Sequence, residues 1–280
     1  MATLLRAESV EELPDNFRRG EIRSVVGKDL FDNRVFDWSL EYLAENHGDV
    51  PVSTHSKFNG KEFAYDSLPM AEFQSRIESV VGNEKYLASE DKGPLYGVLN
   101  SKRVHNSKLV AGPLEKLHRH QLNFLWLGMS PGGLHCDYFD NVLMQLHGKK
   151  RIIIFKPEVS DEISQETYVK LPSSQDILSP DNIRACPWID PANYYDVTLN
   201  PGEAVSIPNR AYHSASAITA DSVSLNVFFT PKIGGGCVSP YGRKEDGNPW
   251  WLTNAVMSLS GIYFRLTNRS LLKTGHYETF

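Results

Sequence analysis

The sequence predicts a mainly β protein, a sandwich or jelly roll with flanking helices. Two observations favour this class. Between residues 121 and 229, short apolar runs recur with turn residues between them, and no long helical pattern separates them. Such spacing is typical of all-β sandwiches and jelly rolls. At 280 residues, 41% of them hydrophobic, the chain is also long enough to enclose a sizeable core.

Local signals in the first third of the chain predict helices and one hairpin. Asp37 precedes an apolar pattern that predicts a capped helix ending near Gly48. Asn59-Gly60 lies between two strand-like runs, as in a type I′ hairpin. A second helix is expected just after Pro69, because the apolar residues there recur at helical spacing.

From residue 121 onward the pattern predicts β-strands. Residues 157–196 interrupt it, because they are acidic and rich in proline, and we expect an excursion with short helices there. The strands are expected at 121–127, 134–138, 142–146, 151–155, 195–199, 203–207, 212–218 and 222–229.

We therefore expect three regions along the chain. Residues 1–100 supply helices and strands that pack on the core, and residues 101–232 form the jelly-roll core. Residues 233–280 form a helical tail. The tail is expected to pack on its own core or on a second copy of the chain, through the large apolar side chains of Trp250, Trp251 and Phe264.

Charge and cysteine content limit the functional classes. The net charge of −5 gives no global attraction to nucleic acid. Cys136, Cys186 and Cys237 lack CxxC spacing and are expected to be free thiols in a reducing compartment. The opening residues lack a signal-peptide pattern, and no segment approaches the ~20 apolar residues of a membrane span. We expect an intracellular protein, cytoplasmic or nuclear, without a membrane partner.

Residues 101–120 are locally basic, in contrast with the chain as a whole. Their cationic side chains alternate with histidines, and Glu115 is the one acidic residue among them. The segment is either a solvated face of a loop and short helix or a groove for a phosphate backbone. The cationic residues are Lys102, Arg103, Lys108, Lys116 and Arg119.

The stretch from His135 to Lys156 carries the candidate site. A strand places residues i and i+2 on one face, so His135 and Asp137 can point together. His213 follows a later predicted strand, and a jelly roll could fold it back beside them. Two histidines and one carboxylate form the facial triad of non-haem Fe(II) oxygenases. Zinc is the competing metal, although a structural zinc site usually has a cysteine or a fourth protein ligand.

Lys150 lies in the second half of this stretch and has two interpretations. A lysine inside a jelly roll is costly unless its ammonium group meets an anion. The distal carboxylate of 2-oxoglutarate would be such an anion, with a tyrosine hydroxyl as a second donor. Alternatively, the Lys149-Lys150-Arg151 run is a solvated hairpin tip. The spacing alone favours neither.

Three blocks of sequence resemble a known family. GGLHCDYFDNVLMQLHGKKRIIIFKP, LNPGEAVSIPNRAYHSA and SVSLNVFF are similar to the JmjC/cupin-like 2-oxoglutarate oxygenases, which are double-stranded β-helix proteins, and the resemblance covers roughly residues 20–232. It implies that Fe(II) is bound by His135, Asp137 and His213. It also implies a 2-oxoglutarate pocket formed by Lys150, Tyr96, Asn141 and Asn226. One departure is Gly132-Gly133, where many members have Thr or Ser. The hydrogen bond that this Thr or Ser gives to the cosubstrate is therefore expected to be lost here, or to be replaced by one from Tyr96 or Asn141.

The resemblance also implies a function. Members use O₂ and 2-oxoglutarate to hydroxylate a C–H bond, and their C-terminal helical segment often forms a homodimer. WSLEYLAENHGDVPV and KFNGKEFAYDSLPMAEF resemble the branch that hydroxylates the modified tRNA base wybutosine, so a tRNA base is the first expectation for the substrate. The alternatives are a protein side-chain hydroxylase or lysine/arginine demethylase, and a non-catalytic cupin binding module.

Overall fold

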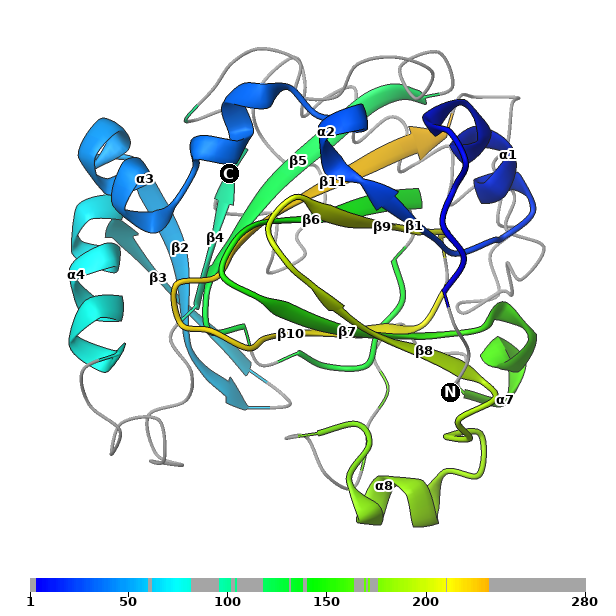
Figure 1. Cartoon of the computed structure of the whole chain (residues 1–280). Helices are drawn as coiled ribbons and strands as arrows, with labels where there is room; N and C mark the ends of the chain where they lie inside the picture. Colours follow the sequence, from blue (N-terminus) through cyan, green and yellow to red (C-terminus); the bar gives the residue numbers. More distant parts are fainter. Residues whose placement is uncertain are drawn as a thin grey trace.

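Two antiparallel sheets face each other and form the predicted jelly roll (Figure 1). The large sheet has the strand order β1-β9-β6-β11-β5-β4-β2-β3, and the small sheet has the order β10-β7-β8. The structure, a computed structural model, describes residues 4–59, 62–81, 96–101, 104, 118–130, 132–137, 140–163, 169, 171, 176–209 and 211–231.

The strands of the large sheet are β1 (Arg23–Val26), β2 (Pro51–Asn59), β3 (Glu62–Pro69), β4 (Tyr96–Asn100), β5 (His118–Gly128), β6 (Asp140–His147), β9 (Glu203–Ile207) and β11 (Val223–Pro231). Those of the small sheet are β7 (Lys150–Phe155), β8 (Tyr194–Leu199) and β10 (His213–Ala217). The described helices are η1 (Val10–Glu12), α1 (Leu13–Arg18), α2 (Gly27–Leu30), η2 (Asn33–Asp37), α3 (Leu40–His47), α4 (Met70–Val81), η5 (Pro157–Val159), α7 (Ser160–Ile163) and α8 (Pro180–Ala185).

The chain crosses repeatedly between the two sheets. β5, β6, β9 and β11 are neighbours in the large sheet, whereas β7, β8 and β10 make up the small one. His135, between β5 and β6, adds an isolated antiparallel bridge to His213 at the free edge of β10. This alternation of antiparallel strands between two sheets is the double-stranded β-helix that the sequence predicts. The N-terminal strands extend the large sheet at both edges, with β1 at one end and β4, β2 and β3 at the other.

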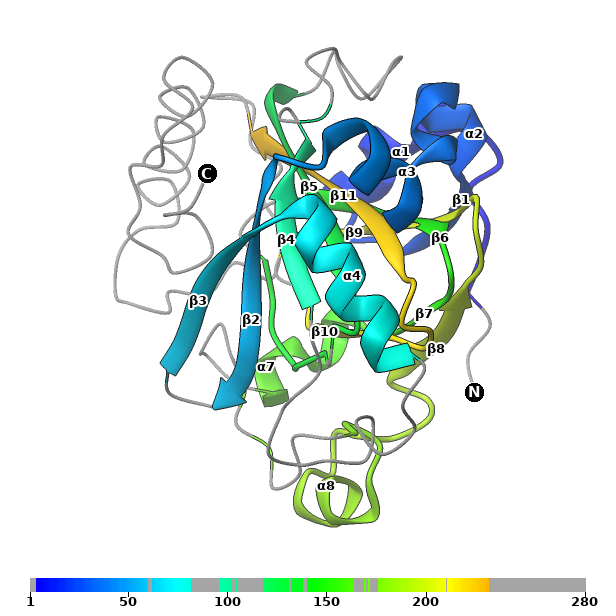
Figure 2. The ribbon, with the colours of Figure 1, turned by 90° about the vertical axis from the view of Figure 1, so that its left-hand side faces the viewer.

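The outer face of the large sheet is covered by N-terminal helices. Figure 2 shows α3 and α4 in front of this sheet. Alternate residues of β11, Leu225 and Val227, are buried in one apolar cluster with Phe17 of α1, Leu43 of α3 and Phe73 of α4. Burying such side chains is the main favourable term in forming this layer, at roughly 1.5–3 kcal/mol each.

A second cluster fills part of the space between the sheets. Ile152 and Ile154 of β7 pack there with Leu143 of β6 and with Val205 and Ile207 of β9. Both faces of β6 are therefore covered, and every one of its residues except the last is buried. A strand covered on both faces reads as a continuous apolar run instead of an alternating one.

The acidic excursion covers the outer face of the small sheet. As predicted, residues 157–196 contain short helices, here η5, α7 and α8. The Trp188 ring lies edge-on to Phe155, with 5.2 Å between ring centroids. Both rings belong to an apolar cluster on this outer face, and Cys136 is buried in it as well. The residue after His135 therefore faces away from the interior between the sheets.

Two local predictions are confirmed in the N-terminal third. β2 and β3 pair antiparallel from Pro51↔Pro69 to Asn59↔Glu62, which confirms the hairpin. Asn59 is the last residue of β2 and not a turn residue as predicted, and Gly60 lies outside the described residues. The helix expected after Pro69 is α4. Its apolar stripe is buried, with Met70, Phe73 and Ile77 at most 2% exposed.

Two other predictions were wrong in detail. Asp37 does not cap a helix, because it ends η2. Ser39 is the N-cap of α3, and its Oγ accepts a hydrogen bond from the Tyr42 N–H at 3.0 Å. The strand predicted at 134–138 is reduced to the single bridge at His135 among the described residues. This segment pairs with β10 only at His213, the first residue of that strand, so no ladder of hydrogen bonds forms.

Several sequence expectations fall outside the described residues. The tail at 233–280 and Cys237 belong there, as do Lys102, Arg103, Lys108 and Lys116 of the basic segment. No helix in the described part of the chain combines the length and the apolar character that membrane crossing requires.

Candidate metal centre

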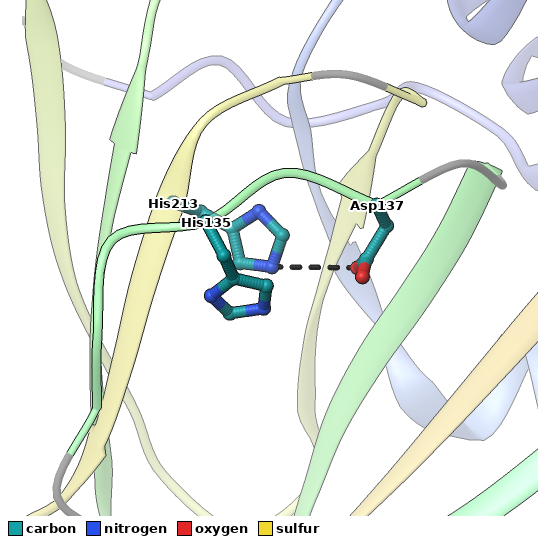
Figure 3. A group of neighbouring side chains, drawn as sticks. All are labelled: His135, Asp137 and His213. Carbon is teal, nitrogen blue, oxygen red and sulfur yellow. Dashed lines mark ion pairs between the residues drawn. The ribbon is translucent and has the colours of Figure 1, made fainter. Parts of the chain in front are cut away.

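Three side chains from two segments of the chain converge between the two sheets (Figure 3). The ligand atoms of His135, Asp137 and His213 all lie within 4.8 Å of one another. The ring centroids of the two histidines are 4.4 Å apart, and His213 Nε2 is 3.5 Å from Asp137 Oδ2. The structure therefore brings together all three residues that the sequence predicts as metal ligands.

Backbone pairing places the two histidines side by side. The His135 N–H donates to the His213 carbonyl at 3.0 Å, and the His213 N–H donates back to the His135 carbonyl at 2.8 Å. In an antiparallel pair, directly opposed residues project their side chains to the same side. Asp137, two residues after His135, returns to that side, whereas Cys136 points into the apolar cluster behind.

Backbone carbonyls fix the tautomer of both imidazoles. His135 Nδ1 lies 2.8 Å from the Gly133 carbonyl, and His213 Nδ1 lies 2.8 Å from the Ala211 carbonyl. A carbonyl only accepts hydrogen bonds, so each Nδ1 carries the proton and each Nε2 keeps a lone pair for a metal. Burial, together with the neighbouring His135, lowers the pKa of His213 to about 4. His213 is therefore neutral at pH 7, as a metal ligand must be.

Asn141 on β6 contacts the carboxylate of the triad. Its Nδ2 donates to Asp137 Oδ2 at 2.9 Å, and its side chain is fully buried. The Oδ1 atoms of Asn141 and Asn226 are both buried without a hydrogen-bond partner among the described residues. Such atoms are rare in native proteins and indicate a missing ligand or water. Two of the predicted pocket residues thus present unused hydrogen-bonding capacity.

Lys150 is inside the protein, so the solvated hairpin tip is the wrong interpretation. It is 2% exposed, and its Nζ reaches from the small sheet to Ser224 Oγ on β11 at 2.5 Å. Burial lowers the pKa of Lys150 to about 7. None of the described carboxylates forms an ion pair with it, so a neutral hydroxyl is the partner that the structure records.

The sequence analysis missed Ser224. Its signal was the alternation in SVSLNVFF, where Ser224 and Asn226 share one face of β11 and Leu225 and Val227 the other. Two polar residues on the inward face of a buried strand indicate a site. The missing information was which face points inward.

The strand register places Tyr96 on the inner face of the large sheet. Tyr96 opposes Gly128, and two residues further along β4 Val98 opposes Trp126, which in turn opposes Ser224. Opposed residues share a face, so Tyr96 belongs to the face that carries Ser224. Tyr96 is 5% exposed.

The departure at Gly132 has a steric explanation. Gly132 has φ +73°, a conformation that side chains rarely adopt. A Cβ there would lie 3.0 Å from Ser214 Oγ and 3.1 Å from the Ala215 carbonyl. The segment before His135 lies too close to β10 for Thr or Ser at this position.

The donor set fits a divalent transition metal with open coordination positions. Two imidazoles and one carboxylate on one side of an ion form the facial triad of Fe(II) oxygenases. No fourth histidine, cysteine or carboxylate joins the cluster among the described residues. A structural zinc site, which is usually closed by four protein ligands, fits less well.

Comparisons with known proteins find relatives that share most of the length of this chain. tRNA wybutosine-synthesizing protein 5 of Danio rerio is 29% identical over 248 residues, which cover 80% of this chain and 73% of that protein. Its Homo sapiens counterpart is 25% identical over 213 residues, covering 69% of this chain and 66% of that protein. tRNA wybutosine-synthesizing protein 4 of Neurospora crassa is 25% identical over 278 residues, covering 87% of this chain but only 21% of that protein.

A family model described as a cupin-like domain matches residues 22–235. This region includes both sheets and all three converging side chains. The chain therefore belongs to the family of cupin-like domains.

Proposed function

We propose that this chain is an Fe(II)- and 2-oxoglutarate-dependent oxygenase that hydroxylates a C–H bond in a modified tRNA base of the wybutosine type. The observation that carries the proposal is the open triad of His135, Asp137 and His213. The substrate class is supported by relatives named tRNA wybutosine-synthesizing protein 5, which match most of this chain.

The triad would hold Fe(II) through the Nε2 atoms of His135 and His213 and one carboxylate oxygen of Asp137. The hydrogen bond from Asn141 to Asp137 Oδ2, the oxygen 3.5 Å from His213 Nε2, would fix the plane of the carboxylate. With 2-oxoglutarate and O₂, iron in such a site supplies the oxidising power for hydroxylation. The protein itself contributes ligand geometry and orientation.

Lys150 and Ser224 would bind the distal carboxylate of 2-oxoglutarate. The ammonium group is a strong donor to a carboxylate, and the Ser224 hydroxyl can donate its own proton while it accepts from Lys150. An anion here removes the cost of a buried cation with a neutral partner. Tyr96, on the same inner face as Ser224, would supply a further hydroxyl.

Asn141 and Asn226 would orient the bound cosubstrate or substrate. Each amide carries a donor and an acceptor, and the buried Oδ1 of each lacks a described partner. A bound group that pairs with them would release the cost of two buried unsatisfied atoms, about 1–3 kcal/mol each.

The remaining parts of the proposal concern partners and location. We propose an intracellular protein that forms a homodimer through residues 233–280, supported by the aromatic side chains of that segment. The alternative substrates are protein side chains, which would be hydroxylated or, if methylated, demethylated. The alternative to an enzyme is a non-catalytic binding module.

Removing the carboxylate ligand tests the enzyme. With Fe(II), 2-oxoglutarate and tRNA from cells that lack this chain, the wild type should form succinate and add the mass of one oxygen atom to a tRNA base. Asp137→Ala should lose at least 100-fold in both readouts, because a two-histidine site holds the metal poorly. Asp181→Ala, an exposed carboxylate on α8, is the matched control and should behave as wild type.

The outcomes separate the alternatives. Succinate without a tRNA product, together with oxygen added to a protein, would replace the tRNA substrate by a protein side chain. Equal succinate formation by wild type and Asp137→Ala would rule out the enzyme.

A further inference from the structure

A buried carboxylate close in sequence to a predicted metal ligand has no role in the proposed chemistry. Asp140 is the first residue of β6, three residues after Asp137, and it is 2% exposed. Its Oδ1 accepts two hydrogen bonds from Asn209, one from the backbone N–H at 2.8 Å and one from Nδ2 at 3.1 Å. Two donors from one half-buried residue meet a single oxygen of the buried Asp140, and this contact fixes both distance and orientation.

Asn209 lies in the loop that leads to the third ligand. This loop, residues 208–212, joins β9 to β10, and His213 is the first residue of β10. The Ala211 N–H donates to the Pro208 carbonyl at 3.1 Å, so the loop is a tight turn. The Ala211 carbonyl then accepts from His213 Nδ1 at 2.8 Å.

A continuous path of contacts therefore connects two ligands. It runs from Asp137 through a side-chain hydrogen bond to Asn141, along the backbone to the adjacent Asp140, then to Asn209, and through the turn at Ala211 to the His213 ring. The ladder between β6 and β9 reaches only Asn141↔Ile207, two residues short of Asn209. Beyond that point, the contact with Asp140 ties the loop to β6.

We propose that Asp140 is a positioning residue that sets the separation and orientation of His213 relative to Asp137 through its contact with Asn209. It touches neither the metal nor the substrate. The proposal rests on the metal centre of the proposed function but on neither the tRNA substrate nor the hydroxylation. The Asp140 carboxylate thereby aligns Asp137 and His213, which lie far apart in the sequence.

Co(II) binding to the full chain provides a test independent of turnover, because the visible spectrum of Co(II) reports ligand geometry. Asp140→Ala should weaken Co(II) affinity by about 10–100-fold, the range for lost outer partners of metal ligands, and should alter the spectrum. Asn209→Asp should have the same effect, because it places a second carboxylate against that of Asp140 and the two repel each other. Asp181→Ala is again the control, with unchanged affinity and spectrum.

A swap of the two side chains separates positioning from general stability. In the double variant Asp140→Asn/Asn209→Asp, the amide introduced at position 140 can donate to the new carboxylate and still accept from the backbone N–H. The double variant should recover most of the Co(II) affinity lost in Asn209→Asp, with a wild-type spectrum. Such non-additivity is expected of residues in direct contact or in one hydrogen-bond network, and not of distant, independent sites.

Specific results would overturn the proposal. Wild-type affinity and spectrum in a folded Asp140→Ala would do so. If Asp140→Ala does not fold, Asn209→Asp and the double variant decide, and failure of the swap to recover affinity rejects the contact as the cause. A wild type that binds Co(II) but hydroxylates nothing would contradict only the proposed function. If the wild type binds no Co(II), the assignment of a metal centre is itself wrong, and the positioning role falls with it.

Discussion

At the scale of single residues, Lys150 is the group whose state depends most on what fills the site. Its amine is buried, its recorded partner is a hydroxyl, and burial lowers its pKa to about 7 from 10.5. Between these values the unfolded chain holds a proton that the native chain releases. Stability from this group therefore rises with pH across that window. A bound carboxylate would reverse the preference, because it favours the ammonium form.

We expect the affinity for 2-oxoglutarate to fall as pH rises above about 7. In that range binding must return a proton to Lys150, so the dissociation constant should rise by up to about tenfold per pH unit. Calorimetric titration between pH 6 and 9 measures this slope.

Two variants test its source. Lys150→Met should bind weakly at every pH, with a flat profile. Lys149→Met removes an exposed neighbour and should keep the slope of the wild type. A pH-independent affinity in the wild type would contradict the assignment of Lys150 as the anchor.

At the scale of elements, the close packing of residues 132–135 on β10 decides which side chains the segment accepts. Gly132 has a positive φ, and a Cβ added to it would lie only 3.0 Å from Ser214 Oγ and 3.1 Å from the Ala215 carbonyl oxygen. Gly202 also has a positive φ, of +88°, but nothing lies within 4 Å of its Cβ position. The two glycines therefore separate backbone strain from steric contact.

Replacing each glycine by alanine should give unequal losses of stability. Gly202→Ala should cost only the left-handed strain, roughly 1–2 kcal/mol. Gly132→Ala should cost more, because it also pushes the segment away from β10. Chemical denaturation gives both free energies of unfolding. Equal losses would mean that the segment moves away from β10 without cost.

At the scale of the whole molecule, the metal centre joins parts that are distant in the chain. His135 lies between β5 and β6, and His213 begins β10, after the excursion over the small sheet. A metal that binds only the native arrangement stabilises all of it by mass action.

Adding Fe(II) under anaerobic conditions, or Co(II), should raise the Tm of the wild type. At a free concentration 100-fold above the dissociation constant, the gain is about 2.7 kcal/mol. Calorimetry with and without a chelator measures it. Asp137→Ala should show almost no shift, and a shift equal to that of the wild type would place the metal elsewhere.

The fold and the convergence of His135, Asp137 and His213 could be predicted from the sequence, but not the contacts around these three side chains. The strand pattern depends on local alternation, and the two-residue spacing of His135 and Asp137 is also local. Ser224 and Asp140 were missed because their partners, Lys150 and Asn209, are more than sixty residues away. Asp37 was predicted as the cap of α3, whereas Ser39 is the cap in the structure; both residue types are good caps, and only the backbone decides between them.

The backbone bridge between His135 and His213 also has a consequence for folding kinetics. Each histidine reaches its place only when β10 pairs with the segment before β6, a contact between residues far apart in the sequence. The nascent chain presents these ligands separately, so a tight metal site cannot assemble on a partly folded intermediate. If the site binds a metal as proposed, we expect binding to follow folding, and the chain to take up its metal after synthesis.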